Sequence, residues 1–132
     1  SKREKYIETA ALKTIVGFLN SSGGDLLIGV SDDGAIVGIA NEIGQLYTGN
    51  SDKFLLHFKN IFNSRIGVAT NAIVQWRIIL VENSELIWVQ VEPSDKACYL
   101  DNEDFYVRAN PATDKLTGPK LVDYINRRFS TN

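Results

Sequence analysis

The sequence predicts an α+β fold in which a mixed β-sheet with hairpins carries about three helices, as a single domain over residues 1–132. Three observations predict it. Apolar residues recur at helical spacing in three separate segments, and apolar runs typical of strands lie between those segments. The chain has 132 residues and 44% hydrophobic content, which suits one core, and no Pro/Gly/Ser-rich linker divides it.

The first predicted helix covers residues 3–20. Its apolar residues form one stripe: Ile7, Ala11, Ile15, Phe18 and Leu19. Lys13 and the other charged residues of this segment are then expected to face water. Asn20 and Gly23 are the residue types that end helices by adopting a left-handed conformation, so the helix is expected to stop there.

A hairpin is predicted next. Residues 25–30 form a nearly continuous apolar run, which is typical of a central strand covered on both faces. Residues 32–34, Asp-Asp-Gly, tolerate the positive φ of a tight turn. We therefore expect a return strand over residues 35–39, followed by a polar loop over residues 41–50.

A second helix and a second hairpin follow. Ser51 or Asp52 can cap a helix that ends near residues 65–67. Strands are predicted over residues 72–81 and 86–92, joined by a turn at 82–85. Trp76 is expected to meet Trp88 across this pair.

The last third of the chain predicts short strands and one helix. Residues 97–100 are a short strand candidate, and residues 104–108 are a second one. A polar loop is expected over residues 110–115. Thr117 can cap a final helix whose apolar residues are four apart: Leu121, Ile125 and Phe129.

Composition limits the possible partners. Lys and Arg number 14 against 16 Asp and Glu, and the net charge of −2 gives no overall attraction to nucleic acid or to an anionic membrane. A basic binding surface must therefore be local. The single cysteine excludes an internal disulfide framework, and no apolar run is long enough to cross a bilayer, so we expect a cytoplasmic setting without membrane contact. The chain begins at Ser1 without an initiator Met, and we expect a piece of a larger protein.

Several candidate chemical sites are weak. Residues 21–24, Ser-Ser-Gly-Gly, follow a helix, whereas phosphate loops precede one, and the Gly-x-Gly-x-x-Gly pattern is absent. Asp25 and Asp32 lie at opposite ends of one strand and cannot converge on a metal. His57 and Cys98 have no partner at ligand or catalytic spacing, so no cofactor and no metal site are expected.

Residues 106–115 are more suggestive of binding. A strand that ends in Arg108 and continues through Asn110 to Lys115 can place hydrogen-bond donors on phosphates. Further cations would join them if the fold brings these together: Arg65, Arg77, Arg127 and Arg128. Scattered, solvated charge is the alternative interpretation.

Three segments together resemble the Schlafen AlbA-like domain family: residues 18–24, residues 26–34 with 37–38, and residues 105–110. The motif positions are Asn20, Gly23, Gly24, Gly29, Asp32, Gly34 and Gly38. The resemblance spans almost the whole chain. It implies a DNA-binding or nucleotide-binding domain of a bacterial or archaeal protein, of the kind found beside transcription-regulator or ATPase-like, ATP-binding modules.

The chain departs from this family in two places. Members usually open with a strand carrying Glu-Phe-Lys, which residues 1–7 do not supply, and Asn-Ser-Thr-Arg is replaced here by residues 110–115. Related eukaryotic Schlafen proteins resemble nucleases with three carboxylates, of which only Asp32 has a counterpart. One carboxylate cannot hold and orient a catalytic cation, so no autonomous nuclease is predicted.

The leading hypothesis is a non-enzymatic DNA- or RNA-binding domain of a multidomain prokaryotic protein, which contacts phosphates through Arg108, Asn110, Lys115 and neighbouring cations. The expected partners are nucleic acid, other domains of the parent protein and a second copy of the chain. A protein-interaction or dimerisation module is the alternative, favoured by the net charge of −2. A third interpretation is a nucleotide-binding or nuclease-like remnant that uses Asp32.

Overall fold

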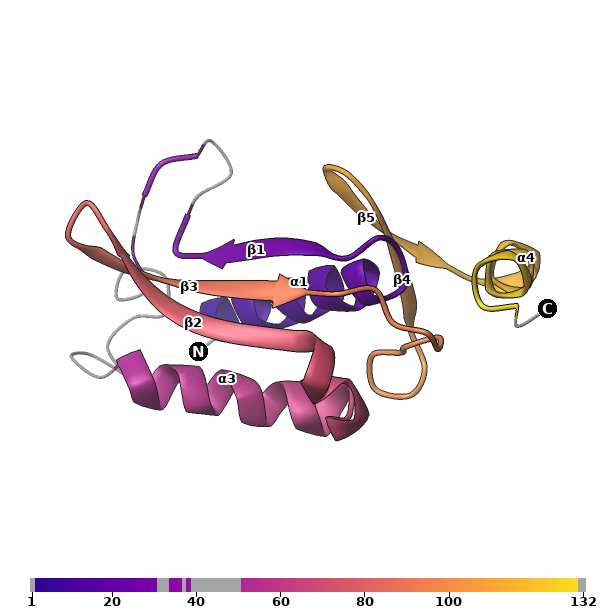
Figure 1. Cartoon of the computed structure of the whole chain (residues 1–132), viewed down its shortest axis with the longest axis horizontal. Helices are drawn as coiled ribbons and strands as arrows, with labels where there is room; N and C mark the ends of the chain where they lie inside the picture. The colour runs from indigo at the N-terminus through magenta and orange to yellow at the C-terminus, as the bar shows by residue number, and fades with distance from the viewer. Residues whose placement is uncertain (1, 31–33, 37, 39–50, 131–132) are drawn as a thin grey trace.

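A three-stranded antiparallel sheet lies at the centre of the molecule, with β1 (Gly24–Ile28), β2 (Val74–Val81) and β3 (Ser84–Val91) in the order β1-β3-β2 (Figure 1). A second, two-stranded antiparallel sheet consists of β4 (Phe105–Ala109) and β5 (Ala112–Leu116). The computed structural model describes residues 2–30, 34–36, 38 and 51–130. The α+β class is confirmed, and within this part of the chain the strands pair only in antiparallel fashion, in two sheets instead of one mixed sheet.

Two helices cover the same face of the three-stranded sheet. They are α1 (Lys2–Leu19) and α3 (Ser51–Arg65), and a 3-10 helix, η1 (Val68–Ile73), leads from α3 into β2 (Figure 1). Their apolar faces meet alternate residues of the strands, because successive strand side chains point to opposite faces. The fully buried large side chains of this core include Leu12, Ile15, Leu19, Phe54, Phe58, Phe62, Ile87 and Val89. The helix α4 (Gly118–Arg128) lies beside β4 and β5 near the C-terminus.

The end of α1 follows the sequence prediction. The Phe18 carbonyl accepts hydrogen bonds from the backbone N–H groups of Ser21 and Gly23, and Gly23 has φ of 75°. A Cβ at Gly23 would lie 2.5 Å from the Val91 carbonyl oxygen. Only glycine therefore allows both the left-handed turn and the close approach of the chain to β3.

Asn20 has a different role from the one predicted for a helix-ending residue. Its side chain is fully buried: Oδ1 accepts from the Cys98 N–H at 2.8 Å, and Nδ2 donates to the carbonyls of Cys98 and Tyr106, both at 2.9 Å. One amide thus joins the end of α1 to the segment before β4 and to β4 itself.

Two expectations for the sheet were wrong. The strand at residues 25–30 is not central: among the described strands β3 is central and β1 is at an edge, where Leu27 remains 42% exposed. The tryptophans do not meet, because Trp76 pairs with Val89 and Trp88 with Arg77. Trp76 faces the core, with ring centroids 5.5 and 5.6 Å from Phe58 and Phe62. The indole N–H of Trp88 donates to Asp25 on the opposite face.

Two further expectations were wrong in the last third of the chain. Residues 97–100 form no strand, only a bridge between Leu100 and Asp104. The backbone N–H and C=O of Cys98 are instead hydrogen-bonded to the buried Asn20 side chain. Residues 110–115 are not a loop: β5 begins at Ala112. The side chains of β5 are exposed or half-buried, so the strand lacks the apolar alternation that identifies strands in a sequence.

The remaining predicted elements are present or lie outside the described residues. The turn between β2 and β3 is a two-residue hairpin turn, Glu82-Asn83, with both φ values positive. Thr117 precedes α4 as predicted, although its side chain makes no capping hydrogen bond. The return strand at 35–39 is described only through a bridge between Val30 and Ile36 and a Gly38 to Gly29 backbone hydrogen bond of 2.8 Å. Asp32 and the predicted loop at 41–50 lie outside the described residues.

Candidate nucleic-acid interface

A basic groove lies between α1 and the β4–β5 hairpin. It encloses about 560 Å³, and we call it the α1–β4 groove. Its lining residues include three cations and three hydroxyl-bearing threonines but no carboxylate: Tyr6, Thr9, Ala10, Lys13, Thr14, Tyr106, Arg108, Thr113 and Lys115. Lysine, arginine and threonine side chains are common donors to phosphate oxygens.

Gly17 sets the width of this groove. A Cβ at Gly17 would lie 3.3 Å from the Val107 carbonyl carbon and 3.4 Å from the Arg108 Cβ. The missing side chain lets β4 pack directly against α1, one helical turn after Lys13. Lys13 and Arg108 therefore line the same groove from two different elements.

Arg108 is held in place from several sides. Its Nε donates to Asn110 Oδ1 at 3.1 Å, and its NH1 donates to Thr113 Oγ1 at 2.6 Å. The guanidinium carbon lies 5.4 Å from the centre of the Phe18 ring, within the range of a cation–π contact. Because these partners are neutral, the positive charge of Arg108 remains available to an anion.

The other two cations of the groove differ in their surroundings. The ammonium of Lys13 lies 5.7 Å from the centre of the Tyr106 ring. Lys115 pairs with Asp104 at 3.0 Å, and this hydrogen bond raises the pKa of Lys115 above its ordinary value. Burial, followed by the Asp104 charge, raises the pKa of Tyr106. Lys115 is therefore charged and Tyr106 neutral at pH 7.

The remaining predicted cations are dispersed. Arg65 donates to both carboxylate oxygens of Asp101, at 2.9 and 2.8 Å, and this contact lowers the pKa of Asp101. Arg77 lies on the outer sheet face over the Trp88 ring. Arg127 pairs with Asp123 on α4 at 3.3 Å, and Arg128 donates to the Ser21 and Ser94 carbonyls. Of the cations predicted to bind nucleic acid, the α1–β4 groove contains Arg108 and Lys115.

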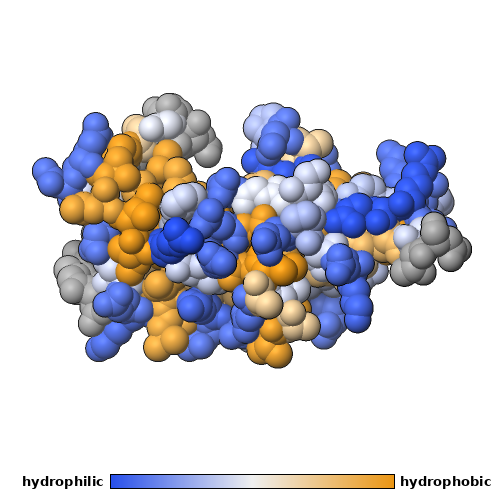
Figure 2. Space-filling model, viewed as in Figure 1, coloured by the Kyte–Doolittle hydropathy of each residue, from blue (hydrophilic) through white to orange (hydrophobic). Residues whose placement is uncertain are grey.

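The outer sheet face is mixed in character. Figure 2 shows apolar side chains gathered over the three-stranded sheet towards the β2–β3 turn and hydrophilic side chains over α4. Leu27, which pairs with Trp88 on this face, is 42% exposed. This face does not present a continuous basic surface.

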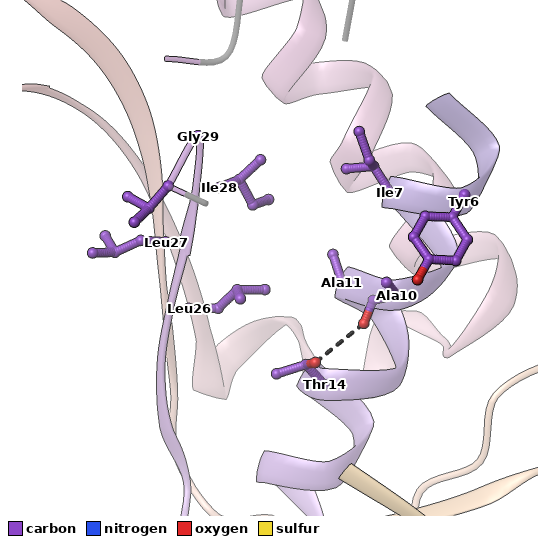
Figure 3. A pocket seen from close by; sticks show the side chains of 10 residues that line it. Tyr6, Ile7, Ala10, Ala11, Thr14, Leu26, Leu27, Ile28 and Gly29 are labelled. Carbon is purple, nitrogen blue, oxygen red and sulfur yellow. Dashed lines mark hydrogen bonds between the residues drawn. The ribbon is translucent and has the colours of Figure 1, made fainter. Parts of the chain in front are cut away.

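A second cavity, between α1 and β1, is apolar. It encloses about 370 Å³. None of its lining residues, drawn in Figure 3, is charged. Leu26 and Ile28 of β1 point towards Ile7, Ala10 and Ala11 of α1. The one hydrogen bond drawn there, from Thr14 Oγ1 to the Ala10 carbonyl at 3.1 Å, is internal to the helix. This cavity offers no donor set for phosphate.

The glycine motif positions surround the start and end of β1. Gly23 precedes the strand and Gly24 is its first residue, while Gly29, Gly34 and Gly38 follow it with positive φ. Within residues 2–30, 34–36, 38 and 51–130, no group of three or more His, Cys, Asp or Glu side chains is arranged to hold a metal ion. No helix in this part of the chain has the length and apolar character to cross a bilayer.

The model of the Schlafen, AlbA_2 family matches residues 1–117. The chain belongs to this family. The crystal structure of the DIP2311 protein from Corynebacterium diphtheriae matches 92% of this Schlafen AlbA_2 chain with a TM-score of 0.66 and 15% identity, which shows a shared fold. The chain spans 22% of the length of that protein. No curated protein matches the sequence.

Sequence reasoning missed several residues of the α1–β4 groove in this Schlafen AlbA_2 domain. Lys13 was expected only to face water, and Thr113 was placed in a loop. A signal was available for Lys13, since it shares one helical face with Gly17 and Asn20 at spacings of four and seven residues. A small residue on that face indicates close approach of another element. Thr113 reaches the groove because the β4–β5 register places it opposite Arg108.

Proposed function

We propose that this domain binds nucleic acid through the α1–β4 groove, with Lys13, Arg108 and Lys115 contacting backbone phosphates. The observation that supports the proposal is that the groove is lined by three cations from three elements and by no carboxylate. Phosphate contacts fix the orientation of a protein on nucleic acid and supply most of the affinity that does not depend on sequence.

Family membership supports the same function, since the resemblance of the sequence implies a DNA-binding or nucleotide-binding domain. The net charge of −2 gives no overall attraction to nucleic acid, so an attractive surface must be local, and the cations of this groove provide one. The domain acts as a binding module of a larger prokaryotic protein, in the cytoplasm, and performs no chemistry alone.

Fluorescence anisotropy with short labelled duplex DNA, single-stranded DNA and single-stranded RNA tests the proposal. Binding through three cations should give a slope of log Ka against log salt of about −2.7 for duplex DNA. Lys13→Glu should weaken binding at least about tenfold and make the slope shallower by about one. The comparison of the three probes also determines which nucleic acid is preferred.

Lys120→Glu is the matched control, because it makes the same change of charge at an exposed position on α4, outside the groove. Its salt slope should equal that of the unmodified protein. Equal losses of affinity in the two variants would show that only net charge matters and would contradict a role for the groove. Absence of salt-dependent binding at micromolar protein in low salt would contradict nucleic-acid binding itself.

A further inference from the structure

A second polar groove runs along the edge of β2 that pairs with no strand in the described part of the chain. It encloses about 520 Å³ between α3, η1 and β2, and we call it the β2-edge groove. Its lining residues are Lys59, Asn63, Asn71, Val74, Gln75, Trp76 and Arg77. Successive side chains of a strand point to opposite faces, so a groove that contacts four consecutive residues of β2 must follow the strand edge. In the described sheet the other edge of β2 pairs with β3.

The hairpin fixes which backbone groups face this groove. The two-residue turn Glu82-Asn83 makes Val81 and Ser84 a hydrogen-bonded pair. Along an antiparallel ladder, hydrogen-bonded pairs alternate with non-hydrogen-bonded pairs. Arg77 lies four residues before Val81, so Arg77 and Trp88 are again a hydrogen-bonded pair. The backbone N–H and C=O of Trp76, the residue between Gln75 and Arg77, therefore point away from β3 and into the β2-edge groove.

The side chains of this groove are cationic and amidic. Lys59 is exposed, and Arg77 donates to the neutral Gln75 Oε1 at 3.1 Å. Asn63 Oδ1 is buried and has no hydrogen-bond partner. Since a buried acceptor without a donor is costly, Asn63 favours a ligand that brings an N–H or O–H group. No carboxylate lines the β2-edge groove.

These features favour an acidic peptide over the other possible occupants. Free donors and acceptors on a strand edge repeat about every 6.8 Å, the two-residue period of another extended peptide, and phosphates offer acceptors only. A second copy of the chain paired through β2 would bring Lys59 and Arg77 close to the same cations of its partner. Like charges at an interface oppose association, whereas glutamate and aspartate side chains would be attracted.

We propose that the β2-edge groove binds an extended acidic segment of a protein partner, which adds a strand to β2. The backbone of the segment pairs with the free N–H and C=O of Trp76, and its carboxylates meet Lys59 and Arg77. This activity goes beyond nucleic-acid binding and uses a different surface, because none of the residues lining the β2-edge groove lines the α1–β4 groove.

The probe is a peptide of alternating glutamate and valine with an acetylated N-terminus and an amidated C-terminus, added to isotopically labelled protein. At saturation, hydrogen exchange measured by NMR should slow at least about tenfold at the Trp76 amide. Exchange at the Gln75 and Arg77 amides should stay unchanged, because these amides already face β3. The same peptide with lysine in place of glutamate should not bind.

Lys59→Glu should weaken binding of the glutamate peptide at least about fivefold, and Lys120→Glu should leave it unchanged. An unaltered Trp76 exchange rate with millimolar glutamate peptide would overturn the proposal. The same protection produced by a short oligonucleotide, or by raising the protein concentration alone, would also overturn it and would assign the edge to nucleic acid or to a second copy. A Lys13→Glu protein tests the two proposals separately, since it should bind the peptide normally.

Discussion

Asn20 shows how one residue can define the geometry of a site that it does not line. Its side-chain N–H groups donate to the backbone carbonyls of Cys98 and Tyr106, and its side-chain oxygen accepts from the Cys98 N–H. Tyr106 belongs to β4, which supplies one wall of the α1–β4 groove. The position of that wall relative to α1 therefore depends on a neutral, fully buried amide.

Replacing this amide tests its role. Asn20→Ala leaves three buried backbone groups without partners, and we expect it to lower the free energy of unfolding by roughly 3 kcal/mol or more. Asn20→Asp should also destabilise, because a buried carboxylate would face two carbonyl oxygens. Burial raises the pKa of such a carboxyl group, so the Asn20→Asp protein should gain stability as the pH falls from 7 to 5.

Thermal unfolding followed by circular dichroism at several pH values measures both effects. Ser22→Ala, at an exposed position two residues away, is the matched control and should change stability little. A Tm of Asn20→Asp that does not depend on pH would show that the side chain leaves its buried position. The sequence identified Asn20 as a helix-ending residue, but its partners lie 78 and 86 residues away, and short-range patterns cannot reveal them.

Among the elements, the β2–β3 hairpin supplies the strand that lines the β2-edge groove, and it was the most predictable. It supplies the central strand of the described sheet and the free edge of β2. Apolar runs on both sides of a polar turn identified it, whereas β5 escaped detection because little of it is buried. The register, which separates Trp76 from Trp88, required the length of the turn to be known.

The turn residues of this hairpin are not the most favourable ones. Glu82 and Asn83 have φ of 49° and 65°, in the left-handed region where asparagine and glycine are preferred. Replacing them by Asn-Gly should stabilise the protein by roughly 0.5–1 kcal/mol. Chemical denaturation should show a higher midpoint with an unchanged m-value. A lower midpoint in Glu82→Asn/Asn83→Gly would contradict the assigned turn geometry, and Glu92→Asn, at an exposed position directly after β3, serves as a control outside the turn.

At the scale of the whole molecule, α4 lies beyond the family match, which ends at residue 117. It is attached by a few polar contacts and one aromatic contact. The Tyr124 hydroxyl donates to the Asn20 carbonyl at 2.5 Å, Arg128 donates to the Ser21 and Ser94 carbonyls, and the Tyr124 ring lies 5.8 Å from Phe105. The helix therefore covers the junction of α1 and β4 without contributing to the main core.

A chain ending at Thr117 should still fold cooperatively, because no residue of α4 is buried. We expect a loss of roughly 2–3 kcal/mol, from the lost hydrogen bonds and from exposure of Phe105, which is 1% exposed when α4 is present. Circular dichroism melts of the two chains measure this difference. Loss of a cooperative transition in the shorter chain would show that α4 is part of the folding unit.

The α+β class and most helices and strands could be predicted from local periodicity, and the family from three short segments. The α1–β4 groove could be predicted only in part. Arg108 and Lys115 stand near each other in the sequence, but Lys13 joins them through packing across Gly17. Arg65 was also predicted as a binding residue, and the structure places it outside this groove, in a bidentate contact with Asp101, 36 residues away.

The neutral side chains that hold Arg108 in place have an energetic consequence for binding. A free arginine side chain loses roughly 1.5–2 kcal/mol of rotamer entropy when a ligand immobilises it. Asn110, Thr113 and the Phe18 ring already restrict Arg108 in the unbound protein, so much of this loss has occurred before any phosphate arrives. The guanidinium has five N–H donors, and the hydrogen bonds to Asn110 and Thr113 use two of them, which leaves the others for a ligand. A lysine at this position would carry the same charge but would have to be ordered by the ligand itself.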